Sequence, residues 1–219
     1  NAPAGLTDTA EQGKSESRSL IESWHGKGRN RYVITPRFAI SCSTEQLIAA
    51  GRLHEQYPGT YIQTHLSENK DEIDSTLSLC PDCQDYLEVY ERARLVTDRS
   101  IFGHCIHLSD SECRRLVEAG SVVAHCPTSN LFLGSGLFDM QQANRVGMQT
   151  VLATDIGAGT SFSMLRTMGE AYKVQQLGGY PMSVFESLYK CTLGAAKALH
   201  LDDEIGCFGK GRKADFIVM

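Results

Sequence analysis

Short apolar runs alternate with amphipathic segments along almost the whole chain. A short apolar run bounded by glycine, proline or polar residues predicts a strand with both faces buried. Apolar residues spaced three or four positions apart predict a helix with one face on a core. On these criteria the sequence predicts strands over residues 31–35, 61–65, 100–106, 122–125 and 149–155, and helices over residues 15–24, 44–57, 70–79, 85–95, 109–119, 139–146, 163–177 and 184–199.

The regular alternation of strand and helix predicts an α/β fold with a parallel sheet, because parallel strands need long crossovers that are usually helical. Ser109 and Glu112 form the pattern of a capping box at the start of one of these helices. The last residues follow a different pattern, in which several glycines precede a final predicted strand over 214–218. We therefore expect one α/β unit over residues 1–203 and a separate piece over residues 204–219.

Composition narrows the class of protein. The chain has 219 residues, of which 42% are hydrophobic, and a formal net charge of -5. This mild acidity argues against a nucleic-acid partner, which usually selects a basic stripe. A membrane span is not expected either, because the chain has no run of about 18 apolar residues.

The 8 cysteines indicate a reducing compartment, since several lie inside apolar segments. We therefore expect free thiols and a cytoplasmic location. Cys80 and Cys83 form a single C-x-x-C pair, and without a second pair this argues against a structural zinc knot. The first residue, Asn1, is not methionine, which suggests an internal or trimmed beginning.

Chemically useful side chains stand at or just after the predicted carboxyl ends of the strands. In parallel α/β barrels this is the edge where functional sites are built. The side chains concerned are Arg37 and Phe38, His65 and Glu68, His104, His125, and Asp155.

These residue types suit a hydrolytic metal site. Histidine is a good ligand for zinc or iron, and Asp155 can bind the same metal while accepting a proton from water. Bound metal lowers the pKa of water from 15.7 to about 7 in favourable sites. Glu68 would then carry that proton to the substrate and the leaving group. His104 would polarise the attacking hydroxide or complete the metal shell.

Each residue also has an ordinary structural explanation when it is taken alone. His65 suits a buried, hydrogen-bonded core position, His125 suits a structural role, and Glu68 suits a solvated position or a helix cap. Asp155 suits an N-cap before a glycine turn, and Arg37 suits a salt bridge. The functional interpretation depends on several such groups falling at successive strand ends.

Four segments resemble the deaminase and chlorohydrolase branch of the amidohydrolase superfamily: His65-Leu66-Ser67-Glu68-Asn69, residues 102–108, residues 124–130 and Ala153-Thr154-Asp155. Ile34-Thr35-Pro36-Arg37-Phe38, the opening Asn1-Ala2-Pro3 and residues 134–138 are similar to the members of that branch that act on guanine. The resemblance implies a TIM-type barrel, of which this chain supplies the later strands, followed by a fragment of a small flanking β-domain over 204–219.

The resemblance also implies roles for the residues. His65 and Asp155 become metal ligands that also line the substrate site, and Glu68 becomes the proton shuttle beside His104. Arg37 and Phe38 hold the purine. The implied reaction is hydrolysis of guanine to xanthine and ammonia by metal-bound hydroxide, with one zinc or iron per chain. The implied assembly is a homodimer.

One departure is large. The superfamily takes two more ligands from a His-x-His motif, whereas the closest histidines here are His104 and His107. We therefore expect half of a metal site, and an isolated segment that is inactive. Two alternatives stay open: an enzyme for another aminopurine, a pterin, a triazine or an adenosine derivative, and a non-catalytic scaffold on a decayed barrel. The His-x-x-Glu spacing argues against the small zinc deaminases, which carry His-x-Glu.

Overall fold

The computed structural model describes residues 3–218. Within them, five strands form one parallel sheet, and each strand pairs with the next along the chain. This sequential order and the crossover helices are those of a (β/α) barrel opened along one side. The strands are β1 (Val33–Ile34), β2 (Tyr61–Leu66), β3 (Ser100–His104), β4 (Val122–His125) and β5 (Gln149–Leu152).

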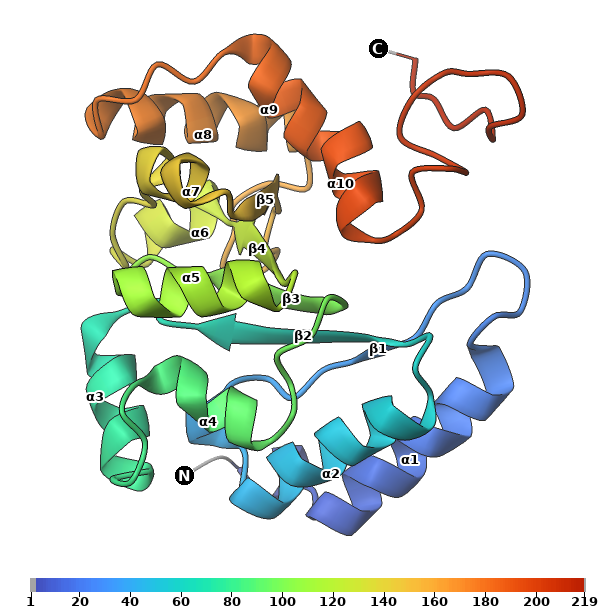
Figure 1. The fold of residues 1–219 in the computed structure, drawn as a ribbon, viewed down its shortest axis with the longest axis vertical. Coiled ribbons are helices and arrows are strands. Elements are labelled where there is room, and N and C mark those ends of the chain that lie inside the picture. The colour runs from blue at the N-terminus through green and yellow to red at the C-terminus, as the bar shows by residue number, and fades with distance from the viewer. Residues whose placement is uncertain (1–2, 219) are drawn as a thin grey trace.

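The helices lie outside the sheet. Figure 1 shows α1–α4 at one end of the sheet and α7–α9 at the other, with α5 between them. The 3-10 turns are η1 (Ala4–Leu6) and η2 (Ala39–Ser41). The helices are α1 (Ala10–Trp24), α2 (Thr44–Gln56), α3 (Lys70–Leu79), α4 (Tyr86–Arg92), α5 (Asp110–Glu118), α6 (Pro127–Phe132), α7 (Met140–Val146), α8 (Met164–Leu177), α9 (Val184–Cys191) and α10 (Leu193–Ala198).

The predicted α/β fold is confirmed, and most predicted elements appear within a few residues of their expected bounds. The capping box at α5 is present as well: the Ser109 side chain accepts from the Glu112 N–H, and the Glu112 carboxylate accepts from the Ser109 N–H. All eight cysteines carry free thiols. Of the opening Asn1-Ala2-Pro3 segment, Asn1 and Ala2 lie outside the described residues.

The prediction of a single helix over 184–199 is wrong. Thr192 adopts φ -126° and ψ -103°, which lies outside the helical region and divides the segment into α9 and α10. The change of direction places the end of α10 against the amino end of β2, where the Tyr61 hydroxyl donates to the Leu199 carbonyl. This helix therefore covers the amino-terminal end of the sheet, opposite the predicted site.

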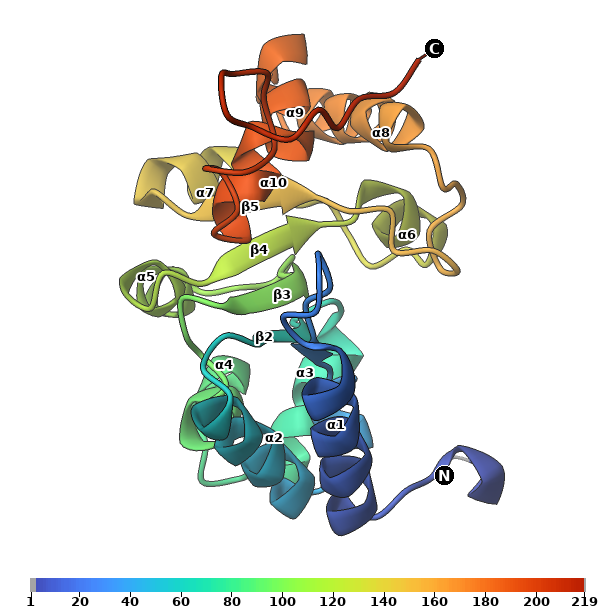
Figure 2. The same ribbon diagram turned by 90° about the vertical axis from the view of Figure 1, so that its right-hand side faces the viewer.

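The predicted strand over 214–218 is also wrong. Those residues run as coil beside the carboxyl-terminal helices, and no described strand pairs with them (Figure 2). A strand needs a neighbour to satisfy its backbone groups, and here the tail is held by Asp215, which pairs with Arg29, and by a bond from the Lys213 N–H to the Glu204 carbonyl.

The largest core lies between the sheet and the helices. Ile62, Leu66, Phe102 and Val123 face this layer and are fully buried. None of the helices among residues 3–218 has the length and apolarity that crossing a bilayer requires.

Two buried tyrosines of α4 connect this core to the carboxyl end of β2. The Tyr90 hydroxyl donates to the His65 carbonyl at 2.8 Å and accepts from the Ala39 N–H at 3.0 Å. Burial raises the pKa of Tyr90, so the hydroxyl keeps the proton that it donates. A single side chain thus joins β2 to the segment that follows β1.

The second tyrosine supports the turn after β2. The Tyr86 hydroxyl donates to Glu72 Oε1 at 2.7 Å, and Glu72 Oε2 accepts from the Glu68 N–H at 2.8 Å. Burial, together with Tyr90 and Glu72, raises the pKa of Tyr86. Glu72 also closes a capping box with Asn69 at the start of α3. The backbone at Glu68 is therefore anchored by groups that water does not reach.

We predict that Tyr90→Phe in the full-length protein lowers the free energy of unfolding by about 1–3 kcal/mol, because the Ala39 N–H and the His65 carbonyl both lose a buried partner. Urea titration measures this change. The matched control is Tyr172→Phe, since Tyr172 is 46% exposed. Equal stabilities for the two variants would contradict the structural role assigned to Tyr90.

Candidate metal centre

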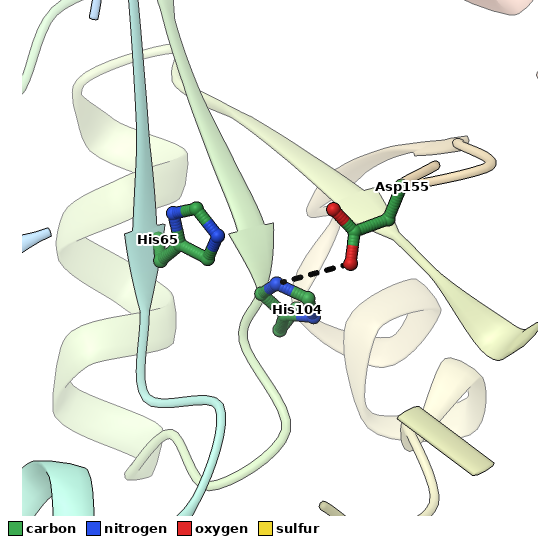
Figure 3. Close-up of side chains that lie close together, drawn as sticks. All are labelled: His65, His104 and Asp155. Carbon is green, nitrogen blue, oxygen red and sulfur yellow. Dashed lines mark ion pairs between the residues drawn. The ribbon is translucent and has the colours of Figure 1, made fainter. Parts of the chain in front are cut away.

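Three side chains converge at the carboxyl edge of the sheet. His65 lies near the end of β2, His104 ends β3, and Asp155 follows β5 (Figure 3). One ligand atom of each lies within 4.8 Å of the others. The sheet therefore brings together two residues that the sequence predicts as metal ligands and a third whose role it leaves open.

The chain turns sharply at these strand ends. Ser67, His104, Cys105 and Asp155 all have positive φ values, from 49° to 68°. Residues with a side chain rarely adopt this left-handed region, and such residues cluster at functional sites. His65 pairs with Gly103, so regular alternation along β3 would turn the next side chain, that of His104, to the opposite face. The His104 ring instead stacks on the His65 ring, with 5.1 Å between the ring centres.

His65 is held in one tautomer. Its Nδ1 lies 2.6 Å from the Arg37 carbonyl oxygen. A carbonyl only accepts, so Nδ1 carries the proton and Nε2 keeps its lone pair. The ring of Phe38 lies 5.6 Å from the His65 ring.

His104 is fully buried and faces two carboxylates. Its Nδ1 lies 2.8 Å from Asn130 Oδ1. Its Nε2 lies 3.7 Å from Glu68 Oε2 and 3.9 Å from Asp155 Oδ2. This arrangement places one imidazole nitrogen between the predicted proton carrier and the predicted metal ligand.

The Glu68 side chain is partly buried. It is 14% exposed, and Ser135 Oγ donates to its Oε1 at 3.0 Å. The two oxygens therefore have different surroundings: Oε1 is held by a hydroxyl, and Oε2 points at His104. A carboxyl group arranged in this way can exchange a proton through Oε2 without changing its rotamer.

The donor set fits a divalent metal. Two imidazoles and a carboxylate are the ligands that zinc and iron accept in catalytic sites. Metal-bound histidines usually donate their second N–H to a carbonyl or a carboxylate, and both histidines here direct Nδ1 to a fixed oxygen. These hydrogen bonds leave Nε2 of both histidines free to bind a metal.

A cavity of about 320 Å³ opens beside these groups. His65, His104 and Asp155 line it together with Val151 and Leu199. Arg37 and Phe38 lie on the segment after β1, with the Arg37 guanidinium 5.5 Å from the centre of the Phe38 ring. Arg37 is exposed, and Phe38 is half-buried.

Two other histidines lie apart from the group. His107 Nε2 lies 2.9 Å from the Ser135 carbonyl oxygen, and its ring is therefore occupied by that loop. His125 is fully buried and stacks on Phe138 at 4.8 Å. Burial lowers the pKa of His125 to about 3, with smaller contributions from Lys190 and His104. This ring stays neutral at physiological pH.

Sequence patterns alone did not single out four supporting residues: Glu72, Tyr86, Tyr90 and Asn130. Asn69 and Glu72 carry a capping-box spacing that was available as a signal. The two tyrosines occupy ordinary apolar positions of a helix, and nothing in their spacing indicates that the Tyr90 hydroxyl bonds to β2 or that the Tyr86 hydroxyl bonds to Glu72.

The chain matches known proteins along its whole length. The Amidohydrolase family matches residues 3–219. Guanine deaminase from Escherichia coli is 53% identical over 219 residues, which cover 100% of this chain and 50% of that protein. Probable guanine deaminase from Deinococcus radiodurans is 42% identical over 97% of this chain and 49% of its own length. The chain therefore spans about half the length of the curated relatives it matches.

Solved structures agree with the fold. The E. coli guanine deaminase superposes with a TM-score of 0.98, covering 100% of this chain and 51% of that one. A guanine deaminase from C. acetobutylicum with bound guanine superposes with a TM-score of 0.89 at 31% identity, covering 96% and 52%. From the match over nearly all of its residues, the chain belongs to the amidohydrolase family.

Proposed function

We propose that the full-length protein hydrolyses guanine to xanthine and ammonia, using one zinc ion per chain. The observation that carries this proposal is the convergence of His65, His104 and Asp155 beside Glu68. The relatives named above support guanine as the substrate. Because this chain covers about half of those relatives, the activity is proposed for the whole protein.

The proposed ligands on this chain are His65 and Asp155, with His104 close enough to join them. A divalent metal bound there would act as a Lewis acid and would lower the pKa of its bound water toward neutrality. Zinc fits two neutral imidazoles and a carboxylate well, and iron accepts the same donors. The remaining ligands are expected from the part of the protein outside this chain.

The side chains divide the proton transfers between them. Asp155 accepts a proton from the attacking water through an oxygen that faces His104. Glu68 takes the other proton of the water and passes it to the ring nitrogen next to the carbon under attack. The proton held by Asp155 then passes through Glu68 to the leaving amine, which departs as ammonia. Ser135 holds the other Glu68 oxygen at 3.0 Å, so that the carboxyl group keeps one orientation through both transfers.

Arg37 and Phe38 are the proposed substrate contacts. An exposed guanidinium beside an aromatic ring suits a flat purine that carries a carbonyl oxygen, because the ring packs on the base and the guanidinium donates to the oxygen. The Phe38 ring lies 5.6 Å from that of His65, which lines the cavity together with Asp155. The pairing of Arg37 with Phe38 favours guanine over flat substrates that lack a carbonyl oxygen facing the guanidinium.

The scaffold alternative fits the site poorly. A decayed barrel has no need to keep two histidines hydrogen-bonded through the same nitrogen, with ligand atoms within 4.8 Å of each other. The proposal also includes a cytoplasmic location, which the free thiols support, and a homodimer, which the family resemblance supports. The division into residues 1–203 and 204–219 is proposed on the change of pattern at that point.

We predict that Glu68→Gln in the full-length protein lowers kcat for guanine by about 10²–10⁴-fold, because an amide cannot carry the proton. Metal content should stay at the wild-type level, since Glu68 is not a proposed ligand. Ammonia release and elemental analysis measure the two quantities. The exposed Glu118→Gln variant is the control. Near-normal turnover of Glu68→Gln would rule out its role as proton carrier.

Removal of the proposed purine contact gives a separate test. Arg37→Ala should lower kcat/KM for guanine by about 10–100-fold, the loss expected for one hydrogen bond to a charged group. Arg52→Ala, also at an exposed position, should leave kcat/KM unchanged. If both variants behave alike, Arg37 does not contact the substrate.

A further inference from the structure

The side chain of Asn130 approaches His104 from a rigid part of the fold. Asn130 lies in α6, directly after β4, and is 1% exposed. Its N–H donates to the Cys126 carbonyl at 3.0 Å, and its own carbonyl accepts from the Ser135 N–H at 2.9 Å. The backbone is therefore held on both sides of the residue, and its amide is presented to the site in one position.

The amide oxygen determines where His104 carries its proton. Asn130 Oδ1 lies 2.8 Å from His104 Nδ1. An amide oxygen only accepts, so Nδ1 is the protonated nitrogen and Nε2 keeps its lone pair. Asn130 Nδ2 is buried and has no hydrogen-bond partner among the described residues, which leaves Oδ1 as the working end of the amide.

Without this contact the proton would favour the other nitrogen. His104 Nε2 faces Glu68 Oε2 at 3.7 Å and Asp155 Oδ2 at 3.9 Å. Two carboxylates at this range attract an N–H, and a protonated Nε2 has no lone pair for a metal. The hydrogen bond from Nδ1 opposes this attraction, because it stabilises only the form in which Nε2 is free.

We infer that Asn130 is a positioning residue that holds His104 with Nδ1 protonated and with the Nε2 lone pair directed between Glu68 and Asp155. The inference rests on the proposed metal centre, which gives the free lone pair its purpose. The same segment serves Glu68, since Ser135 is joined to Asn130 through the backbone and donates to Glu68 Oε1. Residues 130–135 thus orient both His104 and Glu68.

The test is a long-range ¹H–¹⁵N correlation spectrum of ¹⁵N-histidine-labelled full-length protein, freed of metal and held at about pH 8, above the ordinary pKa of histidine. His104→Gln identifies the signals. We expect a protonated Nδ1 and an unprotonated Nε2. The reverse pattern in the wild-type protein would overturn the inference, and this result does not depend on any variant that must fold.

Two substitutions of Asn130 extend the test. Asn130→Asp keeps an acceptor and should keep the proton on Nδ1, whereas Asn130→Leu should move it to Nε2 in most molecules. Zinc affinity, measured by competition with a chelator, should fall about 10–100-fold in Asn130→Leu and recover in Asn130→Asp. A wild-type tautomer in Asn130→Leu, or a lost Nδ1 proton in Asn130→Asp, would overturn the inference. These readouts involve no substrate, so they stand even if guanine proves to be the wrong one.

Discussion

The hydrogen bond from the Tyr90 hydroxyl to the His65 carbonyl helps to fix the position of β2 relative to β1, two strands that the sheet itself joins only weakly. β1 contributes two residues to the sheet, so its pairing with β2 cannot alone fix the segment that carries Arg37 and Phe38. Tyr90 also accepts from the Ala39 N–H, which ties that segment to the end of β2. The proposed substrate contacts and the first proposed ligand therefore share one buried anchor.

Each functional side chain of the site is held by a hydrogen bond to an atom other than the one proposed to react. His65 is oriented by the Arg37 carbonyl, and His104 by the Asn130 amide. Glu68 is held at its backbone by Glu72 and at its side chain by Ser135. In each case the holding group contacts an atom that the chemistry does not use, so the reactive atom stays free and already oriented.

Sequence patterns predicted the elements well where burial decided the structure. The strands over 61–65 and 122–125 were recognised because apolar runs between turn residues have few other solutions. The break at Thr192 and the unpaired tail over 214–218 were missed, because both depend on tertiary contacts and on strand partners rather than on local preference. A strand-like run without a neighbour stays a coil.

Part of the candidate site could also be predicted from the sequence. His65, Glu68 and Asp155 could be placed at one edge because parallel strands bring their carboxyl ends together. The inclusion of His104 with the ligands could not be read from alternation along β3, since its left-handed backbone turns the ring toward His65. Asn130 and Tyr90 act through single atoms of side chains that are otherwise ordinary core residues.

Metal analysis of the full-length protein is the sharpest test of the proposed metal centre. The account predicts about one zinc or iron per chain in the wild-type protein, and loss of most of this metal in His65→Ala, because that substitution removes a ligand already oriented by the Arg37 carbonyl. A wild-type protein purified without chelators that holds no transition metal and gains none when zinc is supplied would contradict the account. Unchanged metal content in His65→Ala would contradict it as well.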